Sequence, residues 1–138
     1  MEVEVDWQYV VDGDEGLDLC QVLYAYTHPD TEEILYVGKA DFSSVYKRLK
    51  GRHKDEIFNY LRSEFQISEM GLLVGQLILE EGRRFSSTLL SDVESLLIHE
   101  LNPPANIQST SSRISRPGLI VTCLGEWPLK DNQFEDAE

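Results

Sequence analysis

The sequence from residue 21 to residue 40 is QVLYAYTHPDTEEILYVGKA, and this stretch decides the fold. Its apolar residues and tyrosines favour extended structure, so we expect one strand from Gln21 to Thr27 and another from Ile34 to Gly38. The polar residues between the two segments are typical of a turn that joins antiparallel strands. The sequence therefore predicts a β-hairpin in which each strand carries a central tyrosine, Tyr24 or Tyr36.

The rest of the chain alternates between strand and helix patterns. Before the hairpin, alternating apolar and polar residues predict a strand from Val3 to Val11. After it we expect, in order, a short basic helix capped by Ser43 or Ser44, a helix at 57–65, a strand at 72–79, a helix at 86–101 and a strand at 119–124. These elements predict a mixed α/β fold in a single domain spanning residues 1–138, with an acidic, disordered tail at 131–138.

Length and composition exclude several classes of protein. The chain has 138 residues, and no run of about 18 apolar residues could cross a membrane. Its first residues are acidic and lack the features of a signal peptide, so we expect a cytoplasmic protein. The two cysteines and three histidines show no spacing typical of zinc ligands.

Charge is distributed very unevenly along the sequence. The chain carries 12 basic and 25 acidic residues, a net charge of −13. Residues 39–54 hold six basic residues and one acidic residue, so this segment carries +5 and the remainder −18. Binding to phosphates needs positive charge, which makes this segment the candidate nucleic-acid interface. Its basic residues are Lys39, Lys47, Arg48, Lys50, Arg52 and Lys54.

A further group of residues has the chemistry of a metal-dependent phosphodiesterase. Glu94 lies in the helix predicted at 86–101, at the edge of its apolar stripe, where a carboxylate is costly unless it is paired or bound to a metal. Carboxylates bind divalent cations, and arginine binds phosphate oxygens in a fork. A tyrosine whose pKa is lowered by neighbouring positive charge can take a proton from water. Glu94, the basic segment and the two hairpin tyrosines supply these parts.

These motifs, in this order, resemble those of the GIY-YIG endonucleases. The resemblance runs from about Leu19 to Ile107, roughly two-thirds of the chain. Val22-Leu23-Tyr24 stands for the first tripeptide of the family and Tyr36-Val37-Gly38 for the second. Residues 39–53 resemble the strand-to-helix signature that follows, and residues 94–106 resemble the second half, in which a helix glutamate precedes a proline and an asparagine.

The resemblance implies a fold, an activity and roles for individual residues. The fold would be a small sandwich with a central three-stranded antiparallel sheet flanked by helices, here with extra strands at both ends, and residues 19–107 would be the nuclease core. The activity would be hydrolysis of DNA phosphodiester bonds with one Mg²⁺ or Mn²⁺ ion. Glu94 would hold the metal, Arg48 would bind phosphate, Tyr24 or Tyr36 would be the general base with Lys39 lowering its pKa, Asn106 would support the site, and His53 would occupy a position where the family often has a histidine or tyrosine.

Two departures from the family pattern bear on these roles. Val22 stands where the family usually has its first glycine. The gap from Gly38 to Arg48 is slightly longer than the family pattern, and Arg48 and His53 are five residues apart, so they do not share a helix face. Arg52 therefore competes with Arg48 for the role of phosphate ligand.

Other interpretations of the same residues remain open. The tyrosines can be core residues, the lysines and arginines a solvated helix face, Glu94 one half of a salt bridge and Asn106 a turn residue. The whole domain can be a catalytically silent module whose acidic surface binds a basic protein or imitates DNA. A nuclease could also act on RNA or on branched or single-stranded DNA, and the sequence decides neither the substrate nor the oligomeric state.

Overall fold

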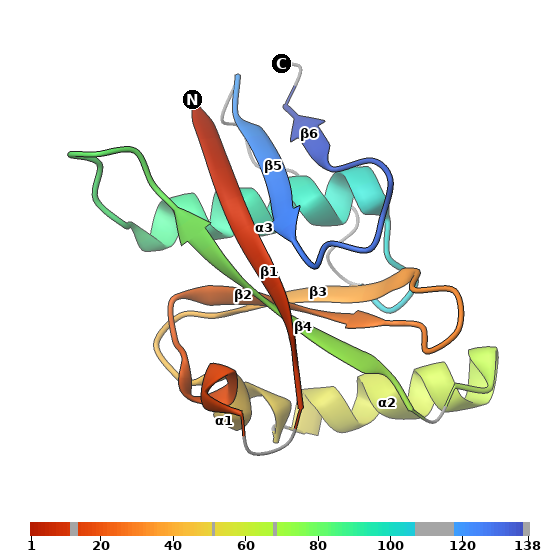
Figure 1. The fold of residues 1–138 in the computed structure, drawn as a ribbon. Coiled ribbons are helices and arrows are strands. Elements are labelled where there is room, and N and C mark those ends of the chain that lie inside the picture. Colours follow the sequence, from red (N-terminus) through yellow and green to blue (C-terminus); the bar gives the residue numbers. More distant parts are fainter. Residues whose placement is uncertain (12–13, 51, 68, 107–117, 137–138) are drawn as a thin grey trace.

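The structure is a computed structural model that describes residues 1–11, 14–50, 52–67, 69–106 and 118–136. These residues form a mixed α+β fold in which a curled sheet has helices on both faces (Figure 1). The strands are β1 (Glu2–Val10), β2 (Val22–Thr27), β3 (Ile34–Ala40), β4 (Gly71–Ile78), β5 (Ile120–Gly125) and β6 (Gln133–Glu135). The helices are the 3-10 turn η1 (Glu15–Asp18) and the α-helices α1 (Val45–Leu49), α2 (Arg52–Phe65) and α3 (Ser87–Leu101).

The described strands form one six-stranded sheet in the order β3-β2-β4-β1-β5-β6. The predicted hairpin of β2 and β3 is present and antiparallel, and β4 pairs with β2 to give three consecutive antiparallel strands. The extra strands predicted at the two ends of the chain extend this sheet, because β1 pairs antiparallel with β4 and parallel with β5. β3 forms one edge of the sheet and β6 the other.

The acidic tail differs from the disordered segment that the sequence predicts at 131–138. Gln133–Glu135 form β6, which pairs antiparallel with β5. Phe134 packs edge-to-face against Trp127, with ring centroids 6.3 Å apart, and Asp136 is buried. Because one aromatic residue anchors this short strand, the high acidic content of the tail does not prevent it from joining the sheet.

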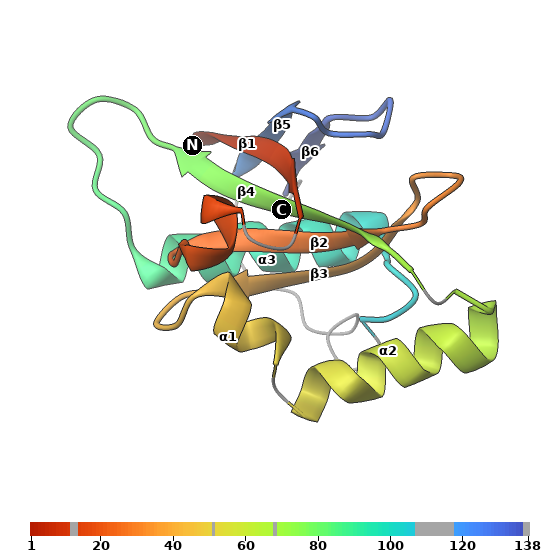
Figure 2. The same cartoon turned by 60° about the horizontal axis from the view of Figure 1, so that its bottom comes forward.

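Two apolar clusters hold the helices against opposite faces of the sheet. On one face, α3 packs on a core that includes Val5, Trp7 and Leu23. On the other face, α1 and α2 cover a second cluster that includes Tyr24 and Tyr36 (Figure 2). Side chains alternate between the faces along β2, so Leu23 and Ala25 belong to the first cluster and Val22, Tyr24 and Tyr26 to the second.

Local signals in the sequence fix the ends of the helices. The Ser44 hydroxyl caps α1 by accepting a hydrogen bond from the Lys47 amide at 3.2 Å, as the sequence predicts. The Ser86 hydroxyl caps α3 in the same way, through the Leu89 amide at 3.0 Å. No described helix is long and apolar enough to cross a membrane.

Candidate active site

Tyr24 and Tyr36 lie on the same face of the β2–β3 hairpin, and Gly38 makes room for them. Tyr24 is directly opposite Gly38 in the antiparallel register, and the two tyrosine rings are 6.1 Å apart between centroids. A Cβ atom on Gly38 would lie 2.7 Å from the Tyr24 hydroxyl oxygen and 2.9 Å from Cε2 of Tyr36. The glycine of the second tripeptide is therefore required by the close approach of two aromatic side chains.

A third tyrosine, Tyr26, completes this cluster and was missed by the sequence analysis. It lies opposite Tyr36, with ring centroids 5.9 Å apart, and 6.2 Å from the Tyr24 ring. Its hydroxyl is buried with no hydrogen-bond partner in the described part of the chain, and burial raises its pKa. The sequence could have predicted that Tyr26 lies beside Tyr24, because residues two apart on a strand share a face.

Arg48 and Glu94 act electrostatically on the tyrosines. Burial raises the pKa of both Tyr24 and Tyr36, so both hydroxyls are protonated at neutral pH. The positive charge of Arg48 opposes this rise at both residues, whereas the negative charge of Glu94 adds to it at Tyr36. Side chains from β2, β3, α1 and α3 therefore meet at one place, although Arg48 and Glu94 are 46 residues apart in the sequence.

Lys39 lies on the face of the sheet opposite to Tyr24 and Tyr36, so the role predicted for it, lowering the pKa of a tyrosine, stays a prediction. It follows Gly38 on β3, so its side chain leaves the opposite face of the sheet, toward α3. There its ammonium group donates a hydrogen bond to the Ser91 hydroxyl. Ser91 lies three residues before Glu94 and is its neighbour on the helix surface. Lys39 thus docks β3 onto the turn of α3 that carries Glu94.

Glu94 is half-buried on α3, the helix that packs against β3. Within the described residues, no three His, Cys, Asp or Glu side chains lie close enough together to hold a metal ion. Among the described residues, a divalent cation at Glu94 would therefore have at most two such protein ligands, and water and phosphate would supply the others. Mg²⁺ is commonly bound in this way, through one or two carboxylates with several waters and substrate phosphates.

Asn106 holds the exposed edge of β3 rather than lining the tyrosine cluster. It is 3% exposed, its Oδ1 accepts a hydrogen bond from the Val37 amide at 2.9 Å, and its Nδ2 donates to the Val37 carbonyl at 2.8 Å. The Ala105 amide donates to the Leu35 carbonyl at 2.9 Å. The segment that contains Ala105 and Asn106 thus satisfies backbone groups on the edge strand that carries Tyr36, and the role predicted for Asn106 in the site stays a prediction.

The basic residues of segment 39–54 do not form one continuous helix. Lys47, Arg48 and Lys50 are exposed on α1 or at its end, and the Lys50 ammonium lies 4.2 Å from the centre of the Tyr46 ring. Arg52, His53 and Lys54 begin the separate helix α2, so helical spacing does not relate them to Arg48. Their side chains lie outside the described part of the structure, and the roles predicted for them stay predictions.

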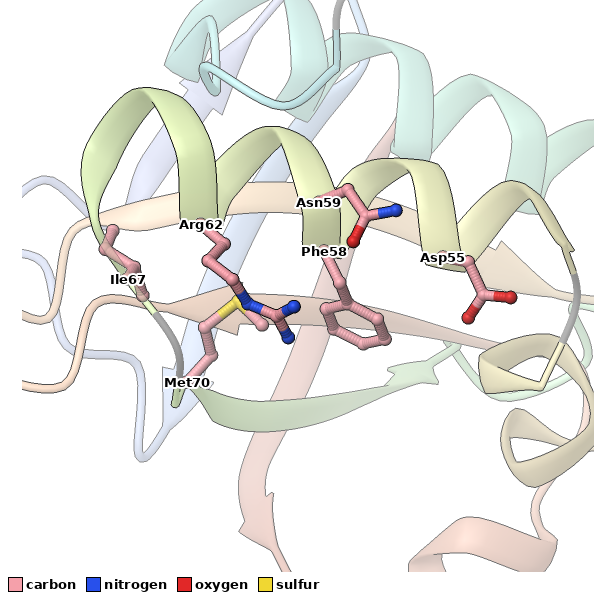
Figure 3. Close-up of a pocket in the computed structure, with 6 residues that line it drawn as sticks. All are labelled: Asp55, Phe58, Asn59, Arg62, Ile67 and Met70. Carbon is pink, nitrogen blue, oxygen red and sulfur yellow. The ribbon is translucent and has the colours of Figure 1, made fainter.

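A pocket on α2 lies next to the tyrosine cluster (Figure 3). Phe58 joins the two regions, because it contacts Tyr26 edge-to-face with ring centroids 5.3 Å apart. Asp55, Asn59 and Arg62 lie on the same face of α2 as Phe58, and Ile67 and Met70 close the far side. The sequence analysis did not identify this pocket, because its apolar wall comes partly from the connection between α2 and β4.

Comparisons with protein-family models, with curated proteins and with solved structures found no match to this chain. The functional argument therefore rests on the residues gathered around Tyr24 and Tyr36.

Proposed function

We propose that the chain is a metal-dependent endonuclease of the GIY-YIG type that hydrolyses phosphodiester bonds in DNA. The observation that carries the proposal is that Arg48 interacts electrostatically with both Tyr24 and Tyr36, and Glu94 with Tyr36. These four residues come from four separate elements and were selected from sequence motifs alone. An antiparallel arrangement of β2, β3 and β4 flanked by helices agrees with the fold that the resemblance implies.

Each residue has a task that follows from its chemistry and surroundings. Arg48 is exposed and permanently charged, so its guanidinium can bind two oxygens of a phosphate. Glu94 would hold Mg²⁺ or Mn²⁺, which when bound polarises the phosphate and stabilises the leaving oxygen.

The tyrosines contribute as hydrogen-bond donors in their resting state. Both hydroxyls are protonated at neutral pH, because tyrosine has an ordinary pKa of 10.0 and burial raises it further at Tyr24 and Tyr36. Tyr24 is 0% exposed, so the Tyr36 hydroxyl is the one that would donate to a phosphate oxygen or orient a water molecule. A tyrosine that acts as general base must first lose its proton. Arg48 favours that loss, because its charge opposes the effect of burial on the pKa of both tyrosines.

Nicking of supercoiled plasmid DNA tests this proposal. We expect the wild type to nick with Mg²⁺ or Mn²⁺ at low salt, and Glu94→Gln to lose roughly a thousand-fold in rate, because metal stabilisation is worth several kcal/mol and each 1.36 kcal/mol is tenfold. Glu100→Gln is the matched control, since Glu100 is exposed in the last turn of the same helix and should leave the rate unchanged.

Two outcomes would overturn the proposal. If the wild type fails to nick with either metal, the chain is not a nuclease on such DNA. If Glu94→Gln, with an unchanged circular dichroism spectrum, nicks as fast as the wild type, Glu94 does not hold the metal.

One observation favours a second function, binding of a basic protein. Glu2 and Glu4 are exposed on β1, and Glu135 is exposed on β6. In the register of the sheet they share a face with Ile120 and Thr122 of β5, and the described helices leave this face uncovered (Figure 1). A silent module that used this acidic face would not bind DNA at any salt concentration, whereas the nuclease should lose DNA affinity steeply as salt rises.

A further inference from the structure

Phe42 presents its whole side chain to solvent. It is 93% exposed, the largest value among the exposed large apolar side chains in the described part of the chain. It lies in the connection between β3 and α1, which extends outward beyond the end of β3 (Figure 2). The connection is held at its far end, because the Val45 amide donates to the Leu19 carbonyl at 3.0 Å and Ser44 caps α1. An aromatic residue displayed in this way has its apolar surface available for a ligand.

The surroundings of Phe42 combine aromatic surface with positive charge. Tyr46, four residues further along the chain in α1, is 47% exposed, and the Lys50 ammonium lies 4.2 Å from its ring centre. Lys47 and Arg48 are exposed between them. Exposed aromatic rings interleaved with cations are the recurring means of binding single-stranded nucleic acid, because bases stack on the rings while the cations follow the phosphates.

The same connection leads directly from the tyrosine cluster to its arginine. Gly38, which packs against Tyr24 and Tyr36, precedes Phe42 by four residues, and Arg48 follows it by six. Phe42 is therefore tethered at both ends to the residues that would surround the scissile phosphate. A base stacked on Phe42 would belong to a nucleotide close to that phosphate.

We propose that Phe42 stacks on an unpaired nucleobase next to the phosphate bound by Arg48, so that the substrate is a nucleic acid with a single-stranded or branched segment. The proposal rests on the proposed function of the site and names its substrate class. In a continuous duplex each base face is covered by its neighbours, so Phe42 has nothing to stack on unless a base is unpaired or at an end. The exposure of Phe42 could not be predicted, because a lone Phe between a strand and a helix carries no sequence signal of it.

Binding measured without cleavage tests this proposal. The full chain carrying Glu94→Gln is titrated, in buffer without divalent metal, into fluorescently labelled single-stranded DNA, a duplex with a single-stranded flap, and a relaxed, covalently closed circular duplex, which has neither ends nor unpaired bases. We expect Phe42→Ala to weaken binding to the first two ligands by about 5- to 100-fold, the range found for loss of one base–aromatic stack, and to leave duplex binding unchanged. Phe42→Trp should restore affinity, because it keeps the aromatic surface.

Phe65→Ala is the matched control, since Phe65 is also exposed, at 44%, but lies at the end of α2 outside the basic segment. It should bind all three ligands like the parent chain. The stacking proposal is overturned if Phe42→Ala changes none of the affinities, changes all three equally, or if the parent chain binds no nucleic acid. It is also overturned if Phe42→Ala loses co-sedimentation with phosphatidylserine vesicles while its nucleic-acid binding is unchanged, which would assign Phe42 to a lipid surface.

Failure of this proposal is distinguishable from failure of the nuclease. If the wild type nicks plasmid DNA but Phe42→Ala binds the flap as tightly as its parent, the nuclease proposal stands and the stacking proposal is wrong. If the chain binds the flap through Phe42 but the wild type does not nick DNA, the stacking proposal stands and the nuclease proposal is wrong.

Discussion

The two ends of the sheet have opposite character. The end formed by β2 and β3 carries the tyrosine cluster and leads into the basic helix α1, and it is covered by helices on both faces. The end formed by β1, β5 and β6 carries acidic residues on a face that the described helices leave open. A polyanion is attracted to the first end and repelled by the second, so this charge distribution would orient a nucleic acid bound as proposed. The net charge of −13 does not reveal this separation of charge.

The largest expected effect on the free energy of unfolding comes from removing a side-chain amide at one edge of the sheet, compared with removing one at the other edge. Asn106→Ala leaves the amide and carbonyl of Val37 without their side-chain partner on β3. Unsatisfied buried groups cost about 1–3 kcal/mol each, so we expect the free energy of unfolding to fall by about 2–4 kcal/mol in urea denaturation. Gln133→Ala on β6 removes an exposed amide and should change it by less than about 0.5 kcal/mol. Equal losses in the two variants would contradict the role of Asn106.

Alanine substitutions at two buried glycines distinguish a loss of stability from a loss of activity. Ala at Gly38 would place Cβ 2.6 Å from Tyr24 Cζ, and Ala at Gly75 would place it 2.7 Å from Val5 Cγ1 and 2.9 Å from the Trp7 ring. Overpacking of this kind typically costs about 1–3 kcal/mol, so both variants should unfold at lower urea concentration. Nicking should fall further in Gly38→Ala, because it alone of the two displaces a site tyrosine. A nicking rate that falls equally in both would show that stability accounts for the loss.

Charge removal at each end tests the orientation of the nucleic acid. With Lys47→Gln and Lys50→Gln combined, we expect the slope of log affinity against log salt concentration to fall by about 1.8, since each phosphate contact contributes about 0.9. Glu2→Gln with Glu4→Gln should leave this slope unchanged, because these residues lie on the opposite end of the sheet. A salt titration of DNA binding measures both. The orientation argument fails if the acidic pair changes the slope as much as the basic pair.

The smallest effect concerns the hydroxyl of Tyr26. Burial raises its pKa above the ordinary value of 10.0, so its contribution to stability is fully present below pH 10 and is lost as pH rises further. Tyr26→Phe should change stability at pH 7 by less than about 1 kcal/mol, because the hydroxyl has no partner in the described structure. It should also lose less stability than the wild type between pH 9 and pH 11, measured by urea denaturation across ~2 pH units. Cys123, whose pKa burial raises to about 12, contributes to the alkaline loss in both proteins and so cancels in the comparison.

Hydrophobic periodicity, helix-capping residues and prolines in the sequence were enough to predict many of the helices and strands. The hairpin of β2 and β3, the cap of α1 at Ser44 and the helix that Pro103 and Pro104 follow were all predicted, because each depends on residues close together in the chain. The sequence also singled out Tyr24, Tyr36, Arg48 and Glu94, which the structure brings together.

Tertiary structure alone decided the surroundings of these residues. Strand alternation was enough to separate Lys39 from Tyr36, but only the position of α3 gave Lys39 its partner Ser91. Tyr26 joined the cluster through cross-strand pairing, Asn106 found its partner 69 residues away on an edge strand, and an acidic tail joined the sheet through Phe134. Each of these outcomes depends on contacts between distant segments, and the energy of such contacts is fixed by the arrangement of the sheet rather than by any local pattern.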